Sequence, residues 1–235
     1  MTELVPRPAR GRRYAHERRV RLSDTGPDGV LRLDGLARYL QDVATDDWSD
    51  ASLDPQGTWV VRRTVVRVAV GGRWPKLGEE VTLTTWCGGT GPAWAERRTD
   101  LEVGGALLIE VVALWVPLDA SGRPLRIDQG FLAVYGEAAA GRRISGRVPP
   151  PPSPSAAETR PWPLRRADLD VLGHVNNAAV WEAVSEVALT PVASAALTHH
   201  GSVEAGSSLS LAAAPGRVWL IGDAAVKVFA EYDPL

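Results

Sequence analysis

Runs of apolar residues bounded by turn-forming residues dominate the first half of the chain. Four runs rich in Val, Thr, Trp and Leu span residues 59–70, 81–87, 94–103 and 106–118. Each ends at Gly, Pro or Asp, which is typical of antiparallel strands. The pair Gly104-Gly105 separates the last two runs and predicts a tight hairpin turn between them.

A helical spacing of apolar residues precedes these runs. The helix is expected to begin at Asp34, a residue that favours helix starts, and to end near Asp46. A short strand at 19–22 and a turn at 24–29 come before it. Its apolar stripe would consist of Leu36, Leu40, Val43 and Ala44.

The same order of elements recurs after a proline-rich segment. Residues 141–161 contain four consecutive prolines, which cannot pair inside a sheet or continue a helix, so an extended linker is predicted. A strand at 162–166, a polar loop at 168–173 and a helix from about 177 to 190 should follow. Further strands are expected at 202–204, 207–213, 217–221 and 225–232.

The chain therefore divides into four segments. They are a disordered head (1–18), a first half (19–140), the linker (141–161) and a second half (162–235). A length of 235 residues suits two subdomains that share a core. Helices on one face of antiparallel sheets give the class α+β.

Composition narrows the functional classes. Hydrophobic residues make up 45% and charged residues 23% of the chain, and the net charge is −2, so a nucleic-acid binder is not indicated. Cys87 is the only cysteine, which excludes an intramolecular disulfide and fits a reducing compartment. Neither a secretory signal nor a run of about 18 apolar residues is found, so we expect a cytoplasmic protein without a membrane span.

Arginine doublets occur at five places along the chain. They are either solvated strand ends or part of a docking patch for an acidic partner protein. The doublets are Arg12-Arg13, Arg62-Arg63, Arg97-Arg98, Arg142-Arg143 and Arg165-Arg166.

The densest group of polar side chains lies just before the second helix. Asp170 precedes His174 by four residues, and Asn176 and Asn177 follow at the expected helix start. Either asparagine can cap the helix, and the free N–H groups there could polarise a carbonyl oxygen. A carboxylate near an imidazole can supply general-base catalysis, while the alternative interpretation makes His174 structural and Asp170 a turn cap. Asp168 is interpreted as structural.

Other catalytic patterns are missing from the sequence. There is no G-x-S-x-G motif, so a serine hydrolase is not indicated. No H-x-x-H, H-E-x-x-H or cysteine cluster suggests a metal, and no cofactor is implied. His199 and His200 are interpreted as an exposed pair at the start of a strand.

The segment D-L-D-V-L-G-H-V-N-N, residues 168–177, resembles the D-L-D-V-N-Q-H-V-N-N motif of plant and bacterial acyl-acyl carrier protein (ACP) thioesterases. Other pieces resemble that family in matching order, so that the likeness covers roughly residues 15–233. They are Thr85-Trp86-Cys87, Arg97-Arg98-Thr99-Asp100, Trp115-Val116-Pro117-Leu118, Gly122-Arg123-Pro124 and Glu204-Ala205-Gly206.

This resemblance implies a double hotdog, in which each of two subdomains wraps an antiparallel sheet around a long helix. It implies hydrolysis of acyl-ACP to a free fatty acid in fatty acid biosynthesis, with ACP as the partner and a monomer or homodimer as the assembly. By position, Asp170 would be the catalytic aspartate, His174 the catalytic histidine and Glu204 the residue that activates or orients water. The acyl pocket would lie on the first-half helix, at Leu36, Leu40 and Val43.

One position departs from the family pattern. The asparagine between the catalytic Asp and His is Leu172 here, and a leucine cannot hold water or donate to an oxyanion. Asn176 or a backbone N–H could replace it. Two alternatives stay open, namely an acyl-CoA thioesterase of the same fold and a non-hydrolytic acyl-binding protein. Whether Asp170 acts as a base or attacks directly through an anhydride is also open.

Overall fold

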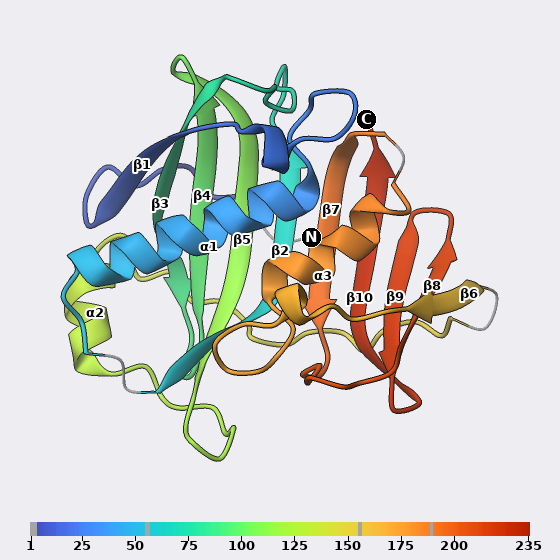
Figure 1. Ribbon diagram of the computed structural model, residues 1–235. Helices are drawn as coiled ribbons and strands as arrows, with labels where there is room; N and C mark the ends of the chain where they lie inside the picture. The colour runs from blue at the N-terminus through green and yellow to red at the C-terminus, as the bar shows by residue number, and fades with distance from the viewer. Residues whose placement is uncertain (1–3, 55–56, 155–156, 189) are drawn as a thin grey trace.

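The computed structural model describes residues 4–54, 57–154, 157–188 and 190–235. Within them, one ten-stranded antiparallel sheet runs through the molecule in the order β1-β3-β4-β5-β2-β7-β10-β9-β8-β6, and helices α1 and α3 lie across one of its faces (Figure 1). The strands are β1 (Arg13–Arg19), β2 (Thr58–Val68), β3 (Glu80–Thr90), β4 (Ala95–Val103), β5 (Ala106–Leu118), β6 (Glu158–Trp162), β7 (Val192–His199), β8 (Leu209–Ala214), β9 (Arg217–Gly222) and β10 (Ala225–Pro234).

The molecule consists of two similar halves that share this sheet. Helix α1 (Leu33–Asp50) covers the strands β1 to β5, and α3 (Asn177–Ser185) covers β6 to β10. The halves join where β2 pairs with β7, for example at Thr64 opposite Leu197. The α+β class and the repeated helix-on-sheet arrangement predicted from the sequence are confirmed.

A single apolar core runs beneath both helices. Leu36 and Val43 of α1, Val184 of α3 and Leu197 of β7 belong to one buried cluster. Each is at most 1% exposed. Burial of such a side chain contributes about 1.5–3 kcal/mol, so the two halves stabilise each other through this shared layer.

The first strand begins earlier than the sequence analysis placed it. Residues 13–18 were assigned to a disordered head, but Arg13–Arg19 forms β1 and pairs with β3 along its whole length. Its alternating exposure shows why it holds, since one face packs on the molecule and the other faces solvent. Arg12, just before the strand, also binds the buried carboxylate of Asp47 at 2.7 Å.

Two elements have weak signals in the sequence. Strand β7 (Val192–His199) contains three alanines, a residue with little strand propensity. The sequence analysis did not predict this strand and placed His199 in an exposed pair at a strand start. In the structure His199 is the last residue of β7 and is partly buried. The short helix α2 (Gln129–Tyr135), capped by Asp128, was not expected either.

The proline-rich linker crosses the sheet on the face opposite the helices. The indole N–H of Trp94 donates to the carbonyl of Ile144 at 2.9 Å, and that of Trp219 donates to the carbonyl of Pro152 at 2.9 Å. The linker then enters β6, which forms the far edge of the sheet (Figure 1).

One arginine doublet is internal and cannot serve as a docking patch. Arg97 pairs with buried Asp47 at 2.7 Å, on the helix side of the sheet. Arg98 is completely buried, 3.6 Å from Glu110, and burial lowers the pKa of its guanidinium. Arg166 is exposed and lies next to the polar loop of the second half.

In the described part of the chain, no helix combines the length and apolarity that crossing a membrane requires.

Candidate active site

The polar loop of the second half is held rigidly before α3. A short 3-10 turn at Arg166–Asp168 opens it, and the Asp168 carboxylate accepts the backbone N–H of Arg165 at 2.8 Å. The Asp168 carbonyl accepts the N–H of Asn176 at 2.7 Å, which fixes where α3 starts. Asp168 is buried, in keeping with its interpretation as structural.

Asp170, His174 and Glu204 lie together at this loop. The N–H of Asp170 donates to the carbonyl of His174 at 2.8 Å, and a β-bridge places His174 opposite Glu204. Oδ1 of Asp170 accepts the N–H groups of Leu172 at 2.9 Å and His174 at 3.2 Å. Among the described residues, Asp170 Oδ2 and the side chains of His174 and Glu204 have no hydrogen-bond partner. The loop therefore presents a carboxylate oxygen, an imidazole and a second carboxylate that remain available.

The two asparagines take different positions at the start of α3. Asn176 is the N-cap, and its side-chain oxygen accepts the N–H of Ala178 at 2.8 Å. Asn177 is the first helical residue. The side chain of Leu172, at the position of the family asparagine, is more than half exposed and points away from the core.

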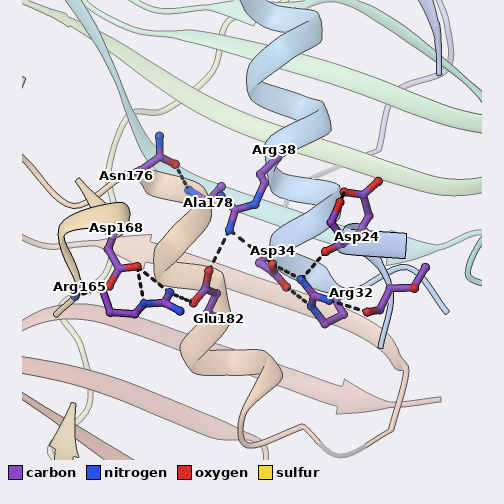
Figure 2. Close-up of polar contacts among 11 residues, drawn as sticks. Asp24, Arg32, Asp34, Arg38, Arg165, Asp168, Asn176, Ala178 and Glu182 are labelled. Atoms are coloured by element: carbon purple, nitrogen blue, oxygen red, sulfur yellow. Dashed lines mark hydrogen bonds and ion pairs between the residues drawn. The ribbon is translucent and has the colours of Figure 1, made fainter. Parts of the chain in front are cut away.

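Charged side chains connect this loop to α1 (Figure 2). Arg165 binds both Asp168 and Glu182 of α3, and Glu182 also binds Arg38 of α1 at 2.8 Å. Arg38 lies 3.6 Å from Asp34, which is itself paired with Arg32 at 2.8 Å. We call this series the inter-helix ion-pair chain. It joins the starts of the two helices through charged side chains.

A large apolar cavity lies in the first half. Its volume is about 330 Å³. Its walls come from the last two turns of α1, from β2 to β5 and from α2. Many of the lining residues are aromatic, among them Trp48, Trp59, Trp115, Phe131 and Tyr135. Cys87 also lines it, and burial raises the pKa of its thiol to about 11, so the thiol is neutral and not a nucleophile at pH 7.

A second, much smaller cavity lies between α1, α3 and the sheet. Its volume is about 30 Å³, and it borders the large cavity because Arg97 and Trp115 line both. Asn177 lines it from α3, and His199 lines it from β7. No side-chain hydrogen bond of Asn177 or His199 occurs among the residues that the structure describes. The small cavity therefore adjoins both the start of α3 and the apolar pocket, and two polar side chains without a partner line it.

The residues proposed from the sequence for the acyl pocket occupy different places. Leu36 and Val43 lie in the shared core, whereas Leu40 lines the small cavity with Asn177. The large cavity uses the following part of the same helix, at Ala44, Thr45, Trp48 and Ser49. Residue spacing predicts the helix but cannot show which of its turns borders empty space.

His199 is the polar residue of this region that the sequence analysis did not select. Its position became visible only with β7, because residues 195, 197 and 199 share the strand face that points toward the helices. The threonine-histidine-histidine segment offers no motif that would have shown which histidine points inward.

Comparison with known families matches both halves of the chain. Residues 11–135 match the model of the acyl-ACP thioesterase N-terminal domain, and residues 153–209 match that of the C-terminal domain. Two uncharacterised proteins from Mycobacterium tuberculosis strains are 31% identical over 216 residues, which is 88% of this chain and 85% of theirs.

Solved structures of thioesterases share the fold. A putative oleoyl thioesterase from Lactobacillus plantarum has a TM-score of 0.81 at 19% identity and covers 95% of this chain and 96% of its own. A 12:0-ACP thioesterase from Umbellularia californica has a TM-score of 0.77 at 19% identity, with 94% and 96% covered. An acyl-ACP thioesterase from Bacteroides thetaiotaomicron has a TM-score of 0.76 at 15% identity, with 94% and 97% covered. The predicted double hotdog is thereby confirmed.

Proposed function

Because the chain belongs to the acyl-ACP thioesterase family, we propose that it hydrolyses the thioester of an acyl-ACP and releases a free fatty acid. The observation that carries this proposal is that the two cavities are neighbours. The small cavity lies at the start of α3, beside the polar loop, and it shares Arg97 and Trp115 in its wall with the large apolar cavity.

Each part of an acyl-ACP, from the pantetheine arm to the acyl chain, has a place along these two cavities. The protein-borne pantetheine arm approaches over the exposed loop, the thioester lies near the start of α3 and the acyl chain extends into the large cavity. A volume of about 330 Å³ lies at the lower end of the range of roughly 300–1,000 Å³ that small-molecule pockets have. We therefore expect a medium-chain optimum.

The loop supplies the groups for proton transfer. Asp170 and His174 accept a proton from water while the water oxygen bonds to the thioester carbon, and Glu204 orients this water. When the carbon–sulfur bond breaks, the thiolate takes up that proton as the leaving thiol. The first turn of α3 directs N–H groups at the carbonyl oxygen, which becomes negatively charged in the transition state.

A direct test is the release of fatty acid from a panel of acyl-ACPs with 6 to about 18 carbons, a range chosen around the capacity of the cavity. Faster turnover of medium chains supports the proposal. A folded protein that releases no fatty acid from any of them contradicts it and favours an acyl-binding role.

The same acyl chains attached to CoA test whether the enzyme prefers ACP or CoA as the carrier of the acyl group. An acidic carrier protein can be bound through exposed arginines such as Arg166 near the loop, whereas CoA offers no protein surface. We expect a higher kcat/KM for the ACP substrates and a fall in that preference at high salt. Equal or better use of CoA substrates would reassign the protein to acyl-CoA hydrolysis.

A further inference from the structure

The small cavity contains a histidine to which the proposed mechanism gives no role. His199 ends β7 at the junction of the two halves, on the sheet face that carries the buried Leu197. It lines the cavity together with Asn177, the first residue of α3. The described residues provide neither side chain with a hydrogen-bond partner. Water or a ligand that enters the cavity can pair with these groups.

The size of the cavity defines what can bind there. A volume of about 30 Å³ exceeds the roughly 10–15 Å³ that one water molecule needs, but it excludes an acyl chain or a pantetheine arm. A carbonyl group fits this space. The cavity also adjoins both the start of α3 and the large cavity, because Asn177 lines it and Arg97 and Trp115 line both cavities. A thioester at the start of α3 with its acyl chain in the large cavity would bring its carbonyl oxygen here.

We propose, on the basis of the proposed function, that His199 is a catalytic residue that donates a hydrogen bond to the thioester carbonyl oxygen, with Asn177 as the second donor. In this role His199 supplies the donor that Leu172 cannot provide. His199 stays neutral throughout. Water forms the carbon–oxygen bond, His174 takes its proton, the carbon–sulfur bond breaks and the proton passes to the thiolate, so His199 neither gains nor loses a proton.

The charge state of His199 agrees with this role. Burial lowers the pKa of the imidazole to about 4, and the positive charge of Arg62 and the neighbouring His200 act in the same direction. Arg97 of β4 adds a further positive charge at the cavity wall, while Asn177 and Gln41 face it from α3 and α1 as neutral groups. A neutral imidazole keeps one N–H donor, and a pKa far below 7 makes it a poor base but a stable donor.

Two substitutions at this position separate donation from packing. His199→Leu removes the donor, and His199→Gln retains an N–H group of similar reach. We expect kcat to fall about 100-fold in the Leu variant with KM nearly unchanged, and the Gln variant to stay within about 10-fold of the wild type. His200→Leu is the matched control, since His200 lines a groove on the opposite face, beside the linker prolines, and should leave kcat unchanged.

A binding measurement on the wild-type protein makes the test independent of activity. The probe is a decanoyl-pantetheine analogue in which a methylene replaces the sulfur and the carbonyl remains. With ¹⁵N-histidine labelling, we expect the ring N–H signal of His199, assigned by its loss in the Leu variant, to shift when the analogue binds. The signal of His200 should not shift.

The outcomes distinguish the two proposals. A folded His199→Leu protein with wild-type kcat overturns the role of His199, and so does an analogue that fails to bind or that binds without shifting the His199 signal. A wild-type protein that hydrolyses no acyl thioester refutes the proposed function. In that case a shifted His199 signal still establishes that the carbonyl binds in the small cavity.

Discussion

The loops that precede α1 and α3 have the same backbone course but different chemistry. Each starts with a 3-10 turn, at Leu22–Asp24 and Arg166–Asp168, and each turn ends in an aspartate whose carboxylate accepts the N–H three residues earlier. Each then passes through a glycine with positive φ, +73° at Gly29 and +77° at Gly173. The hydrogen bonds that build the loop are thus independent of catalysis.

The side chains between these shared points distinguish the halves. Counting from the glycine, His174 corresponds to Val30, and Asn176 corresponds to Arg32. Arg32 pairs with Asp34 and thus begins the inter-helix ion-pair chain, whereas Asn176 caps its helix and leaves the following N–H groups near a cavity. One copy of the loop therefore stabilises the junction of the halves and the other carries the proposed chemistry.

The largest effect on activity is expected from replacing His174, the residue that follows the glycine of the second loop, by alanine. His174→Ala should lower kcat by about 10²–10⁴-fold, because the proposed proton acceptor is lost. Val30→Ala, the matched change in the first loop, should cost stability but leave kcat within a few-fold. Fatty acid release and thermal unfolding of both variants provide the measurement. Similar activity losses in the two variants would indicate that the second loop is only structural.

A dependence of stability on pH should follow from His199. The unfolded chain binds a proton at this residue as the pH falls below about 6.5, but the folded protein does so only near pH 4. The lowered pKa therefore leaves stability intact above pH 6.5, and up to about 3 kcal/mol is lost as the pH falls through 4. Arg62, His200 and Arg97 are the charged or titratable groups nearby.

Urea unfolding at pH 7, 5.5 and 4.5 measures this dependence. His199→Gln cannot be protonated, so its stability should fall less than that of the wild type over the same range. Thr64 lines the same cavity from the first half, and Thr64→Val should keep the wild-type slope. An unchanged slope in the Gln variant would show that other groups cause the acid sensitivity.

The sequence predicted the elements with strong periodicity, and a motif in it selected the candidate site residues. The first-half strands and the Gly104-Gly105 turn were located well because bulky β-branched runs and paired glycines act locally. Asp170 and His174 were selected as candidates because a continuous segment carries them. Their placement beside Glu204 agrees with the positions implied by the resemblance.

Other features could not be read from local sequence. Strand β7 is held by pairing with β2 and β10 on both sides, and such tertiary pairing gives an Ala-rich segment a structure that its own propensity does not favour. The small cavity combines residues that lie far apart in the chain. For this reason the position of His199 beside Asn177 in this cavity became evident only from the structure.

A moderate loss of stability should follow from breaking the inter-helix ion-pair chain. Asp34 is 1% exposed and lies between Arg32 and Arg38, while Ala178 occupies the corresponding second position of α3. Asp34→Ala should cost about 2 kcal/mol, less than for a fully buried pair because both arginines reach solvent. The free energy of unfolding is the measurement. The activity of the folded variant should be nearly unchanged, and Asp34→Asn should lose less stability.

The smallest and most selective change concerns the two glycines. A Cβ added at Gly29 or Gly173 would meet nothing within 4 Å, so alanine at either position adds only the cost of a left-handed backbone, about 1 kcal/mol. The two variants should therefore be destabilised equally in urea. Only Gly173→Ala should lower kcat, by several-fold, because the turn that it strains carries Asp170 and His174. Equal stability with unequal activity is the result that a duplicated fold with one active loop requires, and an equal loss of activity in both variants would contradict it.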